Sequence, residues 1–176
     1  MRAEAIDQKI QTITQGKLQN FRALYQSYAG LVRGALFRLT PRNQIDDLVQ
    51  ETFLKIWRGL ERFEGRSTLK VWIYQIVHHV AIDGLRKKQD FVVGSENLNS
   101  ISESSETRSV DQDLIRHLLQ KLSLEFRSVI ILFFLEELSL NEISEVLAIP
   151  VGTVKSRLHT AKLKMEEELK NLGVSL

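Results

Sequence analysis

The chain has 176 residues, of which 43% are hydrophobic and 26% charged, and its net charge is +2. These values are typical of a soluble globular protein, and the longest apolar run, residues 129–135, is far shorter than the about 18 residues of a membrane-spanning helix. The absence of cysteine excludes disulfides, zinc–thiolate sites and thiol nucleophiles. Residues 1–10 lack the apolar stretch of a secretory signal, so we expect a cytoplasmic protein.

The sequence has only two prolines and nine glycines, which predicts an all-α fold with long helices. In residues 89–110, serines are frequent and large apolar side chains are few, which predicts a flexible acidic linker between two small helical domains. We therefore expect an N-terminal extension (1–16), a first domain (17–88), the linker (89–110) and a second domain (111–176).

Charge is distributed unevenly along these segments. Basic residues outnumber acidic ones at 66–88 and again at 151–164, whereas acidic residues predominate at 89–113. Two basic patches favour a nucleic-acid partner, although solvated helix faces can have the same composition. The opposite charges also predict that the two domains pack together in the free protein and cover their DNA-binding faces.

The first domain begins with two predicted helices. Apolar residues recur at helical spacing from Phe21 to Leu39, and Pro41 ends the pattern. A second amphipathic stretch, around residues 47–60, buries a face that includes Phe53 and places Leu54 among charged residues on the other face. A single exposed leucine is common on soluble proteins, so this face alone does not indicate a binding site.

The third predicted helix, residues 69–88, carries a polar stripe on its outer face that includes Gln75, His78, His79 and Arg86. The loop before it, residues 64–68, combines a glycine, a cation and two hydroxyls, with Ser67 or Thr68 as the helix N-cap. This composition suits a phosphate or an unstacked base, and it equally suits an ordinary capped helix. The adjacent histidines point about 100° apart and have no partners at metal-ligand spacing, so we predict no metal site.

The second domain has the pattern of a helix-turn-helix. Two apolar-rich helices are predicted over 113–122 and 124–135, and Ser139 with Glu142 forms a capping box that opens a short helix ending near Ala148. Pro150 then precedes a final helix. Its outer face is polar with basic residues on both sides, which suits base edges and phosphates in a major groove. These outward residues include Lys155, Ser156, Arg157, His159, Thr160 and Lys162.

Three stretches resemble the extracytoplasmic-function group of bacterial sigma factors, which retain the second and fourth conserved regions of the housekeeping factor. These stretches are DDLVQETFLKIW at 46–57, residues 72–86 ending in AIDGLR, and PVGTVKSRL at 150–158. The similarity covers roughly residues 21–169. It implies an RNA polymerase subunit, and not an enzyme, that brings the core polymerase to promoters.

The resemblance also implies a role for each candidate surface. Residues that contact the core polymerase are Asp47, Gln50, Glu51 and Leu54. Residues that contact the separated minus-ten strand are Arg66, Ser67, Thr68, Gln75, His78, His79 and Arg86. Residues that contact the minus-thirty-five element are Thr153, Lys155, Ser156, Arg157, His159, Thr160 and Lys162.

The implied partners are core RNA polymerase, promoter DNA and an anti-sigma factor, with no cofactor and no small-molecule substrate. The sequence departs from the family's common pattern at Gln75, His78, His79, Ala148 and Thr160. The substitution of glycine by Ala148 predicts a slightly strained turn. An alternative function is a stand-alone helix-turn-helix regulator, or a sigma-factor mimic that titrates an anti-sigma factor.

Overall fold

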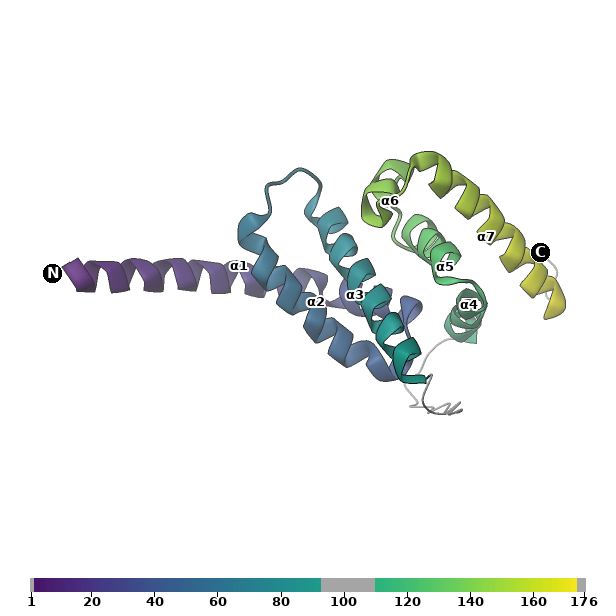
Figure 1. The fold of residues 1–176 in the computed structure, drawn as a ribbon, viewed down its shortest axis with the longest axis horizontal. Helices are drawn as coiled ribbons and strands as arrows, with labels where there is room; N and C mark the ends of the chain where they lie inside the picture. The colour runs from purple at the N-terminus through teal and green to yellow at the C-terminus, as the bar shows by residue number, and fades with distance from the viewer. Residues whose placement is uncertain (1, 93–109, 174–176) are drawn as a thin grey trace.

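The structure is a computed structural model that describes residues 2–92 and 110–173. Most residues in these ranges are helical and none lies in a strand, which confirms the all-α prediction. No helix in the described ranges is long and apolar enough to cross a membrane. The helices, shown in Figure 1, are α1 (Arg2–Leu39), η1 (Arg42–Gln44), α2 (Ile45–Gly59), η2 (Leu60–Arg62), α3 (Leu69–Val92), α4 (Val110–Lys121), α5 (Leu124–Ile130), η3 (Ile131–Leu135), α6 (Leu140–Leu147) and α7 (Val151–Asn171).

The N-terminal domain is built on the second half of α1, together with α2 and α3. Leu36 of α1, Ile56 of α2 and Val77 of α3 are all fully buried in the shared core. The expected helix at 21–39 is the end of a longer helix, because α1 runs without interruption from Arg2, so the expected division at residue 16 falls inside it. The expected linker lies largely outside the described residues.

The C-terminal domain contains α4 to α7, with the helix-turn-helix formed by α6 and α7. Its core includes Leu119, Val129, Ile143 and Val154. The single helix expected over 124–135 is wrong in its second half, where η3 is a π-helical segment and the backbone N–H of Glu136 donates to the carbonyl of Ile131 at 3.0 Å. Such wide turns occur often at functional positions in proteins.

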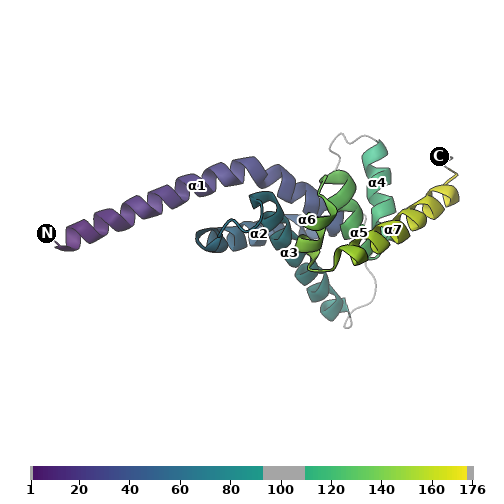
Figure 2. The same cartoon turned by 90° about the horizontal axis from the view of Figure 1, so that it is seen from above.

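The two domains pack side by side, with α6 against α3 and α4 and α5 against the end of α1 (Figures 1 and 2). Their buried residues form one continuous apolar cluster among the described residues. The expected packing of the two domains is therefore present, but the expected covering is incomplete, because Lys155, Ser156, His159 and Lys162 on α7 remain exposed.

Two arginines of the C-terminal domain bind the end of α1. Helix α1 stops before Pro41, so its last carbonyls have no partner within the helix. Arg116, which is 6% exposed, donates to the carbonyls of Phe37 at 2.5 Å and Thr40 at 3.2 Å. Arg127 donates to the carbonyl of Leu39 at 2.9 Å. Positive charge is favoured at a helix C-terminus, so these bonds join the domains electrostatically as well.

We expect Arg116→Leu to lower the free energy of unfolding by about 1–3 kcal/mol, because it removes the hydrogen bonds from Arg116 to the carbonyls of Phe37 and Thr40. Urea denaturation followed by circular dichroism measures the change. Arg22→Leu, at an exposed arginine of α1, serves as the control. Equal denaturation midpoints for the two variants would show that the Arg116 bonds contribute nothing to stability.

Candidate nucleic-acid interface

A surface pocket lies at the loop between η2 and α3. Its volume is about 510 Å³, and Gly65 in the loop has φ +70°, a conformation that favours glycine. Thr68 Oγ1 accepts from the backbone N–H of Val71 at 3.2 Å, which confirms the predicted cap at the start of α3. The residues that line the pocket are Arg62, Phe63, Glu64, Arg66, Ser67, Trp72, Gln75 and Glu145.

The pocket combines aromatic walls with cations. The rings of Phe63 and Trp72 have centroids 5.1 Å apart, and Arg62 and Arg66 lie on the same pocket. Stacking surfaces beside positive charge suit single-stranded nucleic acid. Phe63, Trp72 and Arg62 were not among the predicted site residues, although aromatic and basic residues alternating around a glycine loop could have indicated them. Arg66 pairs with Glu64 at 2.5 Å.

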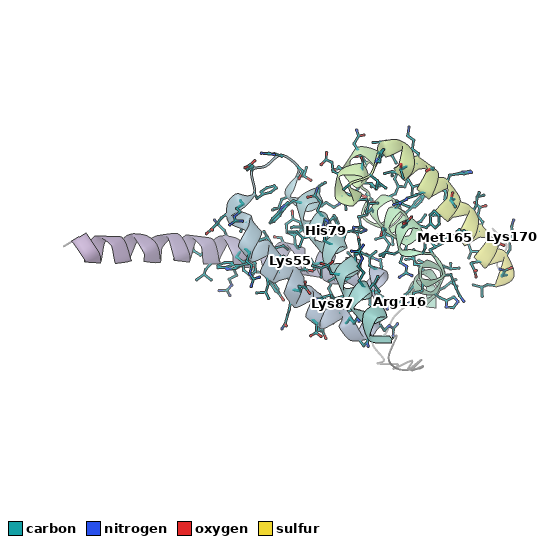
Figure 3. The ribbon with its side chains drawn as sticks, in the orientation of Figure 1. Lys55, His79, Lys87, Arg116, Met165 and Lys170 are labelled. Atoms are coloured by element: carbon teal, nitrogen blue, oxygen red, sulfur yellow. The ribbon has the colours of Figure 1, made fainter. Side chains whose placement is uncertain are left out.

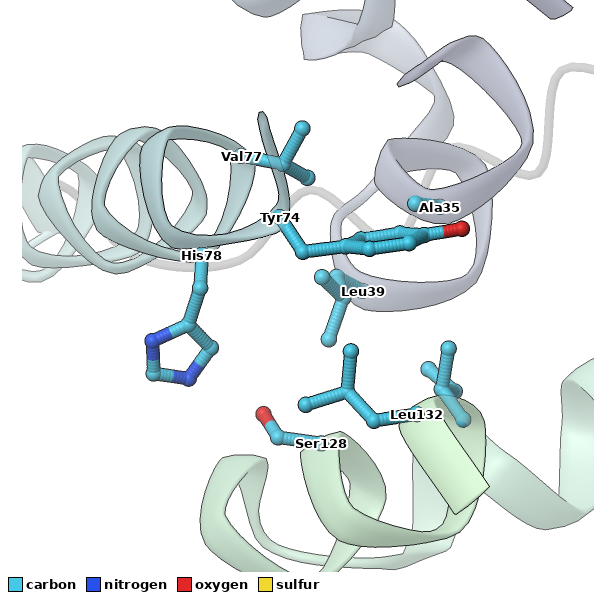
Figure 4. A pocket seen from close by; sticks show the side chains of 8 residues that line it. Ala35, Leu39, Tyr74, Val77, His78, Ser128 and Leu132 are labelled. Atoms are coloured by element: carbon cyan, nitrogen blue, oxygen red, sulfur yellow. The ribbon is translucent and has the colours of Figure 1, made fainter. Parts of the chain in front are cut away.

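The predicted polar stripe of α3 divides between the domain interface and solvent. Gln75 Nε2 donates to the backbone carbonyl of Glu145 in α6 at 3.2 Å. His78 points toward the C-terminal domain and lines a cavity of about 10 Å³ with Tyr74 and Ser128 (Figure 4). His79 and Arg86 are exposed, and His79 is labelled in Figure 3. The structure therefore does not bring these four residues to one open surface.

The interface lowers the pKa of His78. Burial is the largest cause, followed by the charges of His79 and Arg157, and together they lower this pKa from 6.5 to about 4. Burial and a hydrogen bond to Glu136 raise the pKa of the neighbouring Tyr74. Both side chains are therefore neutral near pH 7 in this structure.

The predicted polymerase-binding face of α2 is open to solvent. Asp47, Gln50 and Leu54 are exposed, and the Leu54 side chain is 54% exposed. Glu51 is partly exposed and forms an ion pair with Lys55 at 3.3 Å. The structure thus brings these four residues together on one helix, with an apolar side chain among polar ones.

The helix-turn-helix has the predicted capping box at the start of α6 and the predicted strained turn at its end. Ser139 Oγ accepts from the backbone N–H of Glu142 at 3.3 Å, while the Glu142 carboxylate accepts from the backbone N–H of Ser139 at 2.8 Å. Ala148 has φ +51°, a left-handed conformation that costs an alanine energy, so the predicted strain is confirmed. Ser144 Oγ donates to the carbonyl of Ile149 at 2.6 Å and holds the turn closed.

Most of the outward face of α7 is accessible. Lys155, Ser156, His159 and Lys162 are exposed, while Thr153 and Thr160 are partly exposed. Arg157 differs from this expectation, since its side chain is 25% exposed and pairs with Glu125 of α5 at 2.9 Å. The accessible part of α7 can present hydroxyl, imidazole and ammonium groups to a duplex.

Two family descriptions match this chain. Sigma-70 region 2 matches residues 24–91, and Sigma-70 region 4 matches residues 112–165. The chain is 28% identical to the ECF RNA polymerase sigma factor SigW of Bacillus subtilis, over 95% of this chain and 98% of that protein. It is 33% identical to RNA polymerase sigma factor YlaC of the same organism, over 83% of this chain and 90% of that protein.

A solved structure extends the similarity to the fold. The sigma factor RpoE of Bartonella quintana, determined in complex with the anti-sigma factor NepR, has a TM-score of 0.77 and 26% identity. The match covers 86% of this chain and 98% of that one. The chain therefore belongs to the sigma-70 family. Within that family it is a member of the extracytoplasmic-function (ECF) group, as the sequence motifs predicted.

We expect acid to separate the two domains through His78. In the closed form, in which the two domains are packed together as in this structure, the pKa of His78 is about 4 instead of the ordinary 6.5. The closed form is therefore fully stable above pH 6.5 and weakens as the pH falls toward 4. Between about pH 7.5 and 5.5, the equilibrium constant for packing of the two separated domains into the closed form should fall about tenfold. Because the chain has no cysteine, fluorophores placed at Lys87→Cys and Lys170→Cys can report the separation.

His78→Asn should remove most of this pH dependence, whereas His159→Asn, on the exposed face of α7, should retain it. The charged groups that act on His78 are His79 on its own helix and Arg157 on α7. An identical pH profile for wild type and His78→Asn would assign the effect to another group.

Proposed function

We propose that this chain binds core RNA polymerase and directs it to promoters, where it separates the minus-ten region and starts transcription. The pocket of the N-terminal domain supports this function most directly. Its aromatic walls, Phe63 and Trp72, lie beside Arg62 and Arg66, a combination that suits an extruded base and its phosphates. A protein that bound only duplex DNA would have no use for such a pocket.

The other two surfaces complete the proposed assembly. The α2 face of Asp47, Gln50, Glu51 and Leu54 would bind the core polymerase, with Leu54 supplying an apolar contact. The α7 face would bind the minus-thirty-five duplex, with phosphates neutralised by Lys155 and Lys162. The segments 17–88, 89–110 and 111–176 would serve as the minus-ten domain, the linker and the minus-thirty-five domain. RpoE of Bartonella quintana binds an anti-sigma factor, and we propose a partner of that class here.

Asp47→Ala combined with Leu54→Ala should weaken core binding by about 1–3 kcal/mol, because a solvent-exposed apolar anchor and a charge are both lost. Titration of labelled protein with core polymerase measures the affinity. Leu172→Ala, at an exposed leucine near the end of the chain, is the matched control. If the double substitution left the affinity for core polymerase unchanged, this face of α2 would not be the polymerase-binding surface.

Run-off transcription with core polymerase over a promoter library tests the function as a whole. We expect transcripts that begin at defined sites and require both the protein and the core enzyme.

A second candidate, a stand-alone helix-turn-helix regulator or sigma-factor mimic, is favoured by one observation. The α7 face is exposed in the same structure in which Gln75 and His78 contact the C-terminal domain. Such a protein would bind duplex DNA by itself and support no transcription with core enzyme.

A further inference from the structure

Helix α6 covers part of the pocket of the N-terminal domain. Gln75 on the pocket wall donates to the backbone carbonyl of Glu145, and Glu145 is one of the residues that line the pocket with Arg62 and Arg66. An acidic residue of the C-terminal domain thus borders the pocket that contains the cations proposed to receive a phosphate. Because Glu145 and the phosphates of a nucleic-acid strand are both negative, each is attracted by the positive charge of Arg62 and Arg66, and they repel each other.

Glu136 makes a second contact between the domains. Its carboxylate accepts from Arg38 of α1 at 2.8 Å and from the Tyr74 hydroxyl of α3, while its backbone carbonyl accepts from Lys70 at 2.7 Å. The Glu136 side chain is only 10% exposed. Removing one partner of such a shielded pair leaves the others without compensation, so this contact can hold the domains firmly.

The backbone around Glu136 is locally strained. The π-helical segment η3 ends immediately before it, and the next residue, Glu137, has φ +56° without being glycine. Conformations of this kind persist where the surrounding contacts impose them, and they concentrate at switch regions and functional sites. The chain thus adopts an unfavourable backbone in order to present the Glu136 carboxylate to α1 and α3.

The closed arrangement affects one of the three candidate surfaces more than the others. Leu54 on α2 remains 54% exposed, and Lys155 and His159 on α7 are exposed. Gln75 and His78, by contrast, contact the C-terminal domain. A polymerase or a duplex can therefore dock while α6 still covers part of the single-strand pocket.

We propose that Glu136 and Glu145 form an intramolecular gate that excludes single-stranded DNA from the pocket until the two domains separate. This inference rests on the proposed function of the pocket as the site of a separated DNA strand. Glu136 holds the domains together, and Glu145 occupies the pocket's edge. The apparent affinity for a single strand is reduced by the fraction of molecules that are closed.

The test compares two double variants with the same change in charge. Glu136→Gln with Glu145→Gln removes both gate carboxylates, whereas Glu166→Gln with Glu167→Gln removes two exposed carboxylates of α7. Fluorophores at Lys87→Cys and Lys170→Cys report the separation of the domains in the full chain. Fluorescein-labelled dT12 is the single-strand probe, because stacking tolerates any base.

We expect the gate variant to lose energy transfer and to bind dT12 about tenfold more tightly than wild type, whereas the α7 variant stays within about twofold. Glu145→Gln alone, at an exposed position that should not disturb folding, should give a smaller gain of the same sign. Equal gains in the two double variants would show a plain charge effect and overturn the gate. Opening without tighter dT12 binding, or no opening, would overturn it as well.

Transcription separates failure of the gate from failure of the function. If wild type supports run-off transcription but the gate variant neither opens nor binds dT12 more tightly, the gate is wrong and the proposed function stands. If the gate variant opens and binds dT12 while neither protein supports transcription, the gate stands and the proposed function fails.

Discussion

The arrangement of the two domains depends on the carbonyl groups at the end of α1. Pro41 stops this helix and leaves its last carbonyls without intrahelical donors, and a helix end cannot be buried in that condition. Arg116 and Arg127 supply the donors from the C-terminal domain. Burial of Leu36 and Leu39 beside them then becomes favourable, so one helix end joins two apolar cores into a continuous cluster.

The interface combines two kinds of interaction that respond differently to the surroundings. Its apolar part, around Leu39 and Leu132, is insensitive to charge, whereas the ion pair of Glu136 with Arg38 requires the Glu136 carboxylate to be charged. His78 adds a group that prefers the closed form only while neutral. The proposed function requires the pocket of the N-terminal domain to open at one stage, and an interface of this mixed type can be stable and still separable.

Much of the fold could be predicted because its signals are local. The stop at Pro41, the cap at Thr68 and the capping box of Ser139 with Glu142 depend on residues within one helical turn. The π-helical segment before Glu136 could not be predicted, since an apolar run such as 129–135 suits an ordinary helix equally well. The pocket walls were also missed, because Phe63 and Trp72 meet only when η2 and α3 fold back on each other.

The sequence alone determined most of the helices, the helix-turn-helix and the family, since these follow from periodicity, capping and motifs carried by neighbouring residues. The tertiary structure decided which predicted residues share a surface. Leu54 stays exposed as its helix face predicted, but Gln75 and His78, equally outward on α3, meet the C-terminal domain. The physical reason is that periodicity shows which side of a helix avoids its own core, while contact with a second domain depends on long-range packing and charge.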